Sequence, residues 1–190
     1  GKKFYAQGVS YHCLENSNWR LIGLDSGYST YSPLIHNDYN ALPQSVMDWL
    51  VNVVRLNDST DTRGVILLTH HNVFSGFSSR EYYTIAKQLQ PLIGSRVILQ
   101  IWGHEHKTVL YNLNDLSGYS AYSRCVGTSG FPVDIVQIPQ TARTSGAIAY
   151  DDRIYTNITD KWGSIPTGWN GFIGLEFVGE ELTISYNTLQ

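Results

Sequence analysis

The chain has 190 residues, of which 42% are apolar and 15% are charged, and its formal net charge is −3. This composition is typical of a globular domain and excludes disordered and fibrous proteins. Because the Lys and Arg residues are few and scattered, we expect no stable nucleic-acid binding. The low charge and the many Tyr, Gly and Ser residues favour a secreted or bacterial-envelope protein.

The first segments predict strands and then a helix. Segments 4–14 and 19–24 are strand-like and are joined by the turn "ENSN". A loop rich in Tyr, Ser and Asn follows to about residue 41. In "LPQSVMDWLVNVVRL" the apolar residues recur at helical spacing, and Pro43 stands near the start, where a missing N–H costs nothing. This stretch therefore predicts an amphipathic helix.

The middle of the chain predicts a parallel crossover. "VILLT" (65–69) and "VILQIW" (97–102) are continuous apolar runs, which indicate strands covered on both faces. Between them, "REYYTIAKQLQPLIG" has the apolar spacing of a helix. The order strand, loop, helix, strand predicts that the two strands are parallel neighbours. No segment is apolar for long enough to span a membrane.

Short strand-like pieces make up the rest of the chain. They include "VLYNL", "AYSRCVG" and "GAIAY", and the last segment predicts a hairpin that turns near Gly179 and Glu180. No repeat or linker separates these pieces from the first half, so we expect residues 1–190 to form a single domain. Cys13 and Cys125 form no C-x-x-C motif, and the sequence does not decide whether they form a disulfide.

Three histidines follow the two buried strands directly. His70 comes after the first strand, and His104 and His106 come after the second. The carboxyl ends of parallel strands meet at one edge of a sheet, where open α/β sheets bind ligands. In an H-x-H pair the two side chains can point to opposite sides and serve two neighbouring ions. We therefore predict a metal site with these three histidines as ligands.

Five blocks of the chain resemble, in order, the second half of a calcineurin-like metallophosphoesterase. They are "NWRLIGLDSG", "LPQSVMDWL", "GVILLTHHNVFSG", "LQIWGHEHKTVLY" and "GTSG", and they cover roughly residues 3–130. This superfamily includes purple acid phosphatases and cyclic nucleotide phosphodiesterases. The resemblance implies an α/β fold, a β-sandwich flanked by helices (αββα), of which this chain would be the C-terminal portion.

The resemblance also implies a chemistry, the hydrolysis of phosphomonoesters or phosphodiesters. Two divalent or mixed-valence transition metal ions (Zn, Fe or Mn) would clamp the phosphoester substrate and activate a water molecule. By position, His70 and His104 would bind the second metal and His106 the first. His71 and Asn72, which stand where the family usually has His-Pro, are candidates for substrate contact.

The metal motifs of the family's first half do not occur in the sequence. D-x-H, G-D-x-x-D and G-N-H-[DE] are all missing, so the ligand set is incomplete. One expectation is that the chain is part of a longer enzyme, inactive alone and completed by a missing N-terminal half of the domain or by another chain. The alternative is a degenerate, non-catalytic relative that acts as a ligand-binding or partner-binding module.

Other protein classes fit the histidines less well. A cupin needs a further His downstream, but His106 is the last one, and a metallo-β-lactamase needs H-x-H-x-D-H. A carbohydrate-binding sandwich fits the 13 Tyr, the 5 Trp and the β-rich tail, but it does not explain two buried strands that each end in His. In the enzyme hypothesis, substrate specificity would come from loops 26–41, 72–80 and 131–171.

Overall fold

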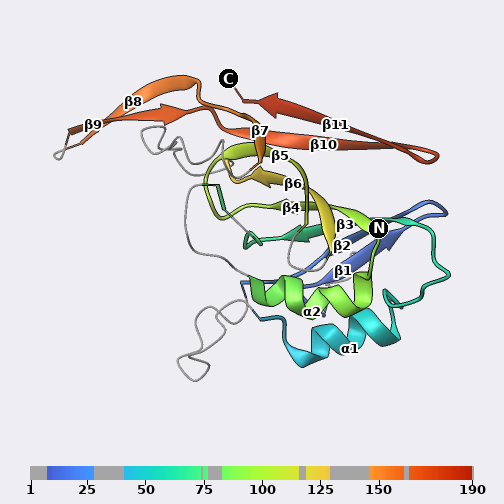
Figure 1. Cartoon of the computed structure of the whole chain (residues 1–190). Helices are drawn as coiled ribbons and strands as arrows, with labels where there is room; N and C mark the ends of the chain where they lie inside the picture. Colours follow the sequence, from blue (N-terminus) through green and yellow to red (C-terminus); the bar gives the residue numbers. More distant parts are fainter. Residues whose placement is uncertain are drawn as a thin grey trace, which may run out of the picture.

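The computed structural model of the chain is built mainly from strands (Figure 1). It describes residues 8–27, 41–73, 75–76, 83–115, 119–128, 146–160 and 163–189. The elements of this part follow the order β1 (His12–Glu15), β2 (Trp19–Gly23), α1 (Gln44–Asn52), β3 (Gly64–Thr69), α2 (Tyr83–Ile93), β4 (Val97–Trp102), β5 (Thr108–Asp115), β6 (Ser120–Val126), β7 (Ala147–Tyr150), β8 (Ile154–Asp160), β9 (Gly163–Gly168), β10 (Gly171–Val178) and β11 (Glu181–Thr188).

Seven strands form one mixed sheet in the order β1-β2-β3-β4-β6-β5-β7. Its centre is parallel, because β2 pairs with β3, β3 with β4 and β4 with β6 in the same direction. Strands β1, β5 and β7 pair antiparallel and form the two sides of the sheet. The carboxyl ends of the four central strands therefore lie at one edge, which is where the histidines are found.

The predicted parallel pair is confirmed. Ile66 of β3 lies opposite Leu99 of β4, and Thr69 lies opposite Trp102. Alternate residues of a strand face opposite sides of a sheet. Accordingly, Leu67 packs in the core beneath the helices, whereas Ile66 packs in the core on the other face. Burial on both faces explains why β3 is apolar at nearly every position.

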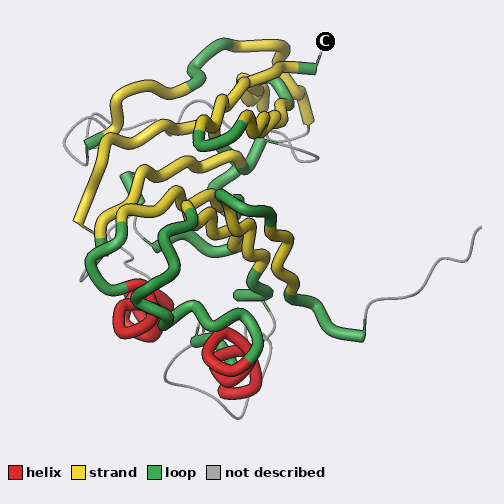
Figure 2. The backbone as a smooth tube through the Cα atoms, turned by 90° about the vertical axis from the view of Figure 1, so that its right-hand side faces the viewer, coloured by secondary structure: helices red, strands yellow, loops and turns green. Residues whose placement is uncertain are grey.

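Both predicted helices are confirmed, and both cover the same face of the sheet (Figures 1 and 2). Val46 and Leu50 of α1 are buried in the core with Ile85 and Leu89 of α2. The apolar pattern continues past the helix to Val53 and Val54, because α1 ends at Asn52. Val53 therefore leaves the helical face, and its side chain is 69% exposed.

The opposite face of the sheet is covered by the β10–β11 hairpin. Val178 pairs with Glu181 across the turn, so the predicted hairpin and the position of its turn are confirmed. The inner side chains of the hairpin pack against Ile66, Leu99 and Ile101 of the sheet. A second hairpin, β8–β9, lies beyond the sheet next to the first one (Figure 1).

The expected fold class, an α/β sandwich flanked by helices (αββα), is wrong. The described residues form eleven strands but only two short helices, and the fold is rich in sheet. The physical reason lies after residue 108, where short alternating pieces broken by Gly and Asn leave no apolar stripe of helical length. Those pieces add strands and hairpins where a second helical layer was expected.

The predicted specificity loops are only partly described. Residues 28–40, 74, 77–80, 131–145 and 161–162 fall outside the described residues. The described remainder of the 131–171 segment contains β7 and the β8–β9 hairpin. Its role in substrate specificity stays a prediction.

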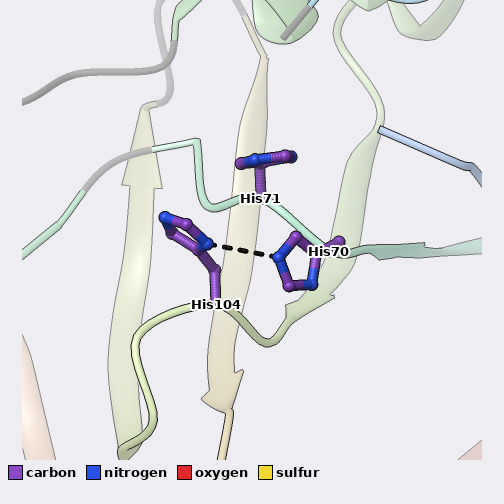
Figure 3. Close-up of side chains that lie close together, drawn as sticks. All are labelled: His70, His71 and His104. Atoms are coloured by element: carbon purple, nitrogen blue, oxygen red, sulfur yellow. Dashed lines mark hydrogen bonds between the residues drawn. The ribbon is translucent and has the colours of Figure 1, made fainter. Parts of the chain in front are cut away.

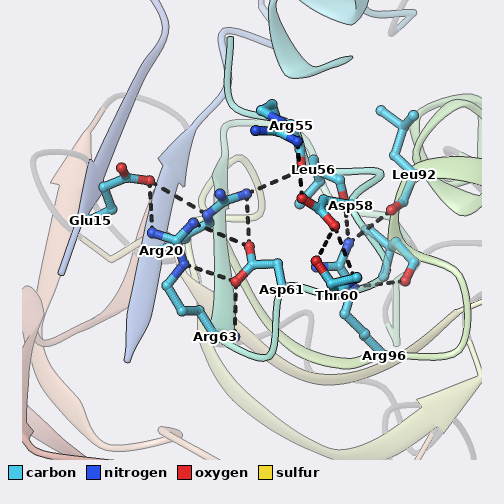
Figure 4. Close-up of polar contacts among 11 residues, drawn as sticks. Glu15, Arg20, Arg55, Leu56, Asp58, Thr60, Asp61, Arg63, Leu92 and Arg96 are labelled. Atoms are coloured by element: carbon cyan, nitrogen blue, oxygen red, sulfur yellow. Dashed lines mark hydrogen bonds and ion pairs between the residues drawn. The ribbon is translucent and has the colours of Figure 1, made fainter. Parts of the chain in front are cut away.

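An ion-pair network connects β2 with the loop that precedes β3 (Figure 4). It lies at the amino ends of these strands, and the histidines follow the carboxyl ends. Arg20 of β2, only 5% exposed, contacts Asp61 at 3.1 Å and Glu15 at 3.5 Å. Asp61 also accepts a hydrogen bond of 2.9 Å from Arg63. Burying an unpaired guanidinium costs several kcal/mol, roughly, and the ion pair with Asp61 offsets much of this cost for Arg20.

Two further observations concern membranes and thiols. Across the described ranges, no helix has the length and apolar character needed to cross a bilayer. Cys13 and Cys125 are both free. Cys13 is half-buried in β1 and Cys125 is buried in β6, and these strands are separated by three others in the sheet. The disulfide that the sequence left open is therefore not formed.

Candidate metal site

The carboxyl ends of β3 and β4 bring three histidines together (Figure 3). His70 and His71 follow β3, and His104 follows β4. The nitrogens that these residues could offer to a metal all lie within 4.8 Å of one another. The closest approach joins Nδ1 of His104 to Nε2 of His70 at 3.2 Å. The expected proximity of His70 and His104 is confirmed, and we call the group the three-histidine site.

Backbone hydrogen bonds fix the turn that carries His70 and His71. The hydroxyl oxygen of Ser26 accepts hydrogen bonds from both backbone N–H groups, at 3.1 and 3.0 Å. The same oxygen lies 3.3 Å from Nδ1 of His71. The N–H of Gly103 donates to the carbonyl of His70 at 3.2 Å, which ties the two loops together. Ser26 thus orients the site from the end of a third parallel strand.

Sequence analysis did not identify Ser26. The available signal was the "LDSG" block, whose serine follows β2 just as the histidines follow β3 and β4. The carboxylate of Asp25 in the same block accepts a hydrogen bond of 3.1 Å from the N–H of Gly27. A serine in a loop has many roles, so its function became visible only in the tertiary structure.

The turn that carries His104 and His106 has an unusual backbone. Both residues have positive φ, 63° and 28°, a region that side chains rarely adopt. Gly127 packs tightly against this turn, since a Cβ added there would lie 2.7 Å from the nitrogen of His106. The turn is therefore held by its neighbours, and the simple alternation of side chains along a strand does not apply to it.

Glu105 anchors the same turn from the inside. Its carboxylate accepts a hydrogen bond from the hydroxyl of Ser75, which lies in the loop after β3. Burial raises the pKa of Glu105, and the Ser75 hydrogen bond acts against this shift. Ser75 and Glu105 thus connect the loops that follow β3 and β4, as the Gly103–His70 bond does at the surface.

The electrostatics of the site favour neutral imidazoles. Burial and, to a lesser extent, nearby charge on His104 and His70 lower the pKa of His71 to about 4. Burial also lowers the pKa of His104, with His70 and His106 acting in the same direction. A neutral imidazole has a lone pair available for a metal ion. At neutral pH, both His71 and His104 are therefore in the state that binds metal.

The structure places the other predicted site residues differently. His106 is exposed and lies outside the three-histidine site, so its role as a ligand stays a prediction. Asn72, proposed as a substrate contact, is buried. His71, proposed for the same role, is also buried but is part of the site. We infer that His71 is better suited to bind a metal ion than to contact substrate.

The donor set decides what the site could hold. Three neutral nitrogen ligands suit one transition metal ion with an open coordination position. Among the described residues, the group contains no carboxylate that could bridge two ions. These residues therefore fit one ion and do not complete a two-metal centre.

Comparisons with known proteins do not assign a family. No family model matches the chain, and no curated protein matches it.

Proposed function

We propose that the three-histidine site binds one divalent transition metal ion and that the protein serves in metal-dependent hydrolysis of phosphoesters. The observation that carries the metal proposal is the 3.2 Å between Nδ1 of His104 and Nε2 of His70. Two nitrogens bound tetrahedrally to one ion, each about 2.0–2.1 Å from it, lie about 3.3 Å apart. The His70–His104 pair already has this spacing, and the third ligand atom, from His71, lies within 4.8 Å of both.

Each residue of the site has a distinct task in this proposal. His70 and His104 are exposed and would hold the ion where a substrate can reach it. His71, only 4% exposed, would hold it from the protein side. Ser26 keeps the His70–His71 turn in place. A bound metal ion would supply Lewis-acid polarisation of a phosphoryl oxygen and would lower the pKa of a water molecule.

A two-metal centre with His106 as a further ligand remains a proposal based on the resemblance. It needs ligands beyond those that the described residues bring together. The expected source is the missing N-terminal half of the domain or another chain. The second candidate function, a non-catalytic metal-dependent binding module, is favoured by the donor set, because the described residues do not complete the two-metal centre that the resemblance implies.

Metal binding is tested by calorimetric titration of the chelator-treated full chain with Zn²⁺ and with Mn²⁺. We expect one ion per chain, and we expect His70→Ala and His104→Ala each to weaken binding by more than about tenfold. His12→Gln is the matched control, because His12 lies in β1 outside the site. Equal affinities in the wild type and both alanine variants would refute the assignment.

Catalysis is tested separately with bis-p-nitrophenyl phosphate as substrate. The hydrolase proposal expects turnover by the metal-loaded chain that is abolished by EDTA and lost in His104→Ala. Tight metal binding without any turnover would contradict catalysis by this chain alone, and it would agree both with the binding module and with an enzyme that needs further ligands from outside this chain. His106→Ala then separates two roles, since unchanged metal affinity with lost turnover would place His106 on the substrate side.

A further inference from the structure

A second site of different character lies between the sheet and the β10–β11 hairpin. It is a pocket of about 320 Å³. Four aromatic residues from three separate segments line it, namely Tyr150, Trp169, Phe172 and Tyr186. Phe172 and Tyr186 are 50% and 40% exposed. Rings that stay exposed around a cavity of this size mark a binding surface more often than a packing defect. We call it the aromatic pocket.

Polar groups with fixed positions line the same pocket. The guanidinium of Arg153 donates to both oxygens of Asp151, at 2.8 and 2.6 Å, and its backbone N–H donates to the same carboxylate at 3.2 Å. Asp152 and Asn187 add a second carboxylate and an amide. These donors and acceptors stand beside aromatic rings, which is the combination that binds a molecule with apolar faces and polar edges.

Hydrogen bonds fix the walls of the aromatic pocket. The N–H of Gly171 donates to the carbonyl of Thr128 at 3.3 Å, and the N–H of Asp151 donates to the carbonyl of Thr108 at 3.0 Å. Nε of Arg124 donates to the hydroxyl of Tyr186 at 2.7 Å, which holds that ring. Because the walls are already ordered, a ligand loses little free energy in organising them.

Glycine at position 171 allows β10 and β11 to approach closely at this end of the hairpin. A Cβ added there would lie 2.7 Å from the carbonyl oxygen of Asn187 in β11, whereas its 3.4 Å distance to the hydroxyl oxygen of Thr128 is an ordinary contact. A side chain would therefore disturb the pairing of the two strands of the hairpin. Phe172 and Asn187 lie beside this point, and both line the pocket.

The charge of the lining selects among ligands. Arg153 offsets Asp151, and Asp152 leaves an excess of negative charge in the lining. An anionic ligand is therefore disfavoured, which separates this pocket from any phosphate chemistry at the three-histidine site. A neutral ring with apolar faces and several hydroxyl groups would stack on the aromatic residues and hydrogen-bond the carboxylates and the amide.

We propose that the aromatic pocket binds a neutral saccharide. Its volume is at the lower end of the range for small-molecule sites, roughly 300–1,000 Å³, which suits a mono- or disaccharide unit. This binding does not depend on a metal ion. It would give the protein a means of attaching to, or selecting, a glycan-bearing molecule.

The test is saturation-transfer NMR and calorimetry on the EDTA-treated full chain with maltose, cellobiose and N,N′-diacetylchitobiose. We expect at least one of these sugars to bind, and we expect Phe172→Ala to weaken binding by about tenfold through the lost stacking surface. Asn187→Ala should weaken it through lost hydrogen bonds. Tyr122→Ala is the control, because this exposed tyrosine of β6 lies outside the pocket lining.

Several results would overturn the saccharide assignment. The first is that none of the three sugars binds, and the second is that Phe172→Ala binds them as the wild type does. A third is binding of choline chloride that is lost in Phe172→Ala, which would make the pocket a site for organic cations. Competition of sugar binding by inorganic phosphate would also contradict a site that disfavours anions. All four results are independent of metal binding.

Discussion

The burial of His71 should make the free energy of unfolding of the metal-free protein decrease as the pH is lowered from about 6.5 to about 4. Its pKa is about 4 in the folded chain and about 6.5 when it is unfolded. Above pH 6.5 both states carry a neutral imidazole, and the full stability is present. As pH falls from 6.5 towards 4, the unfolded state takes up a proton that the folded state does not, so stability is lost.

The size of this loss follows from the difference between the two pKa values. Each pKa unit corresponds to about 1.4 kcal/mol, so the loss totals roughly 3 kcal/mol once the pH is below 4. This is a large part of the 5–15 kcal/mol or so that stabilises a typical domain. The Ser26 contact of His71 favours the protonated form, and the pKa of about 4 already contains this opposing effect.

The assay is urea denaturation at pH 7.5 and pH 4.5 in the presence of EDTA, for the wild type and for His71→Gln. The variant keeps an amide near Ser26 but has no group that titrates at this position. Contributions from carboxylates are common to both proteins and cancel in the comparison. We expect the wild type to lose about 2 kcal/mol more than the variant. Equal losses in the two proteins would refute the claim that His71 is held neutral by burial.

Two further substitutions test the framework around the site. Asp61→Ala should cost about 3 kcal/mol in urea denaturation, because Arg20 stays buried without its closest partner. Asp58→Ala serves as its control, because Asp58 pairs with the exposed Arg55 and not with Arg20. It should have a far smaller effect, whereas equal effects would contradict a structural role for the network. Gly127→Ala should lower Zn²⁺ affinity several-fold in calorimetry, since its new Cβ displaces the turn at His106. Gly8→Ala, which adds a methyl group to open space, should bind as the wild type does, and unchanged affinity in Gly127→Ala would contradict a locked turn.

Local patterns were enough to predict the central elements. The apolar spacing of residues 44–52 and 83–93 identified both helices, and continuous apolar runs identified β3 and β4. The segment that links β3 to β4 has the length of a crossover, so their parallel pairing also followed. Because parallel strands end at one edge, the proximity of His70 and His104 could be predicted without any structure.

The arrangement of the second half could not be predicted in this way. Strand β6 lies between β4 and β5, and β7 adds to the far side of β5. Alternation along a strand shows that it has two faces, but it does not select the strand's neighbour. The resemblance suggested further helical cover, and the αββα prediction failed because the chain after residue 108 forms hairpins.

The two sites also combine features that the local sequence predicts with features that only tertiary packing produces. The sequence by itself determined that His70 and His104 follow buried neighbouring strands, since strand periodicity and crossover length are local properties. Only the tertiary structure decided that His71 joins them and that His106 lies outside the group. The turn that carries His104 and His106 has positive φ at both residues, so strand alternation could not predict this outcome. Tertiary packing alone also brought Ser26 beneath the histidines and assembled four aromatic residues from three segments into one pocket. Contacts of this kind depend on distances between residues far apart in the chain, and no local pattern encodes those distances.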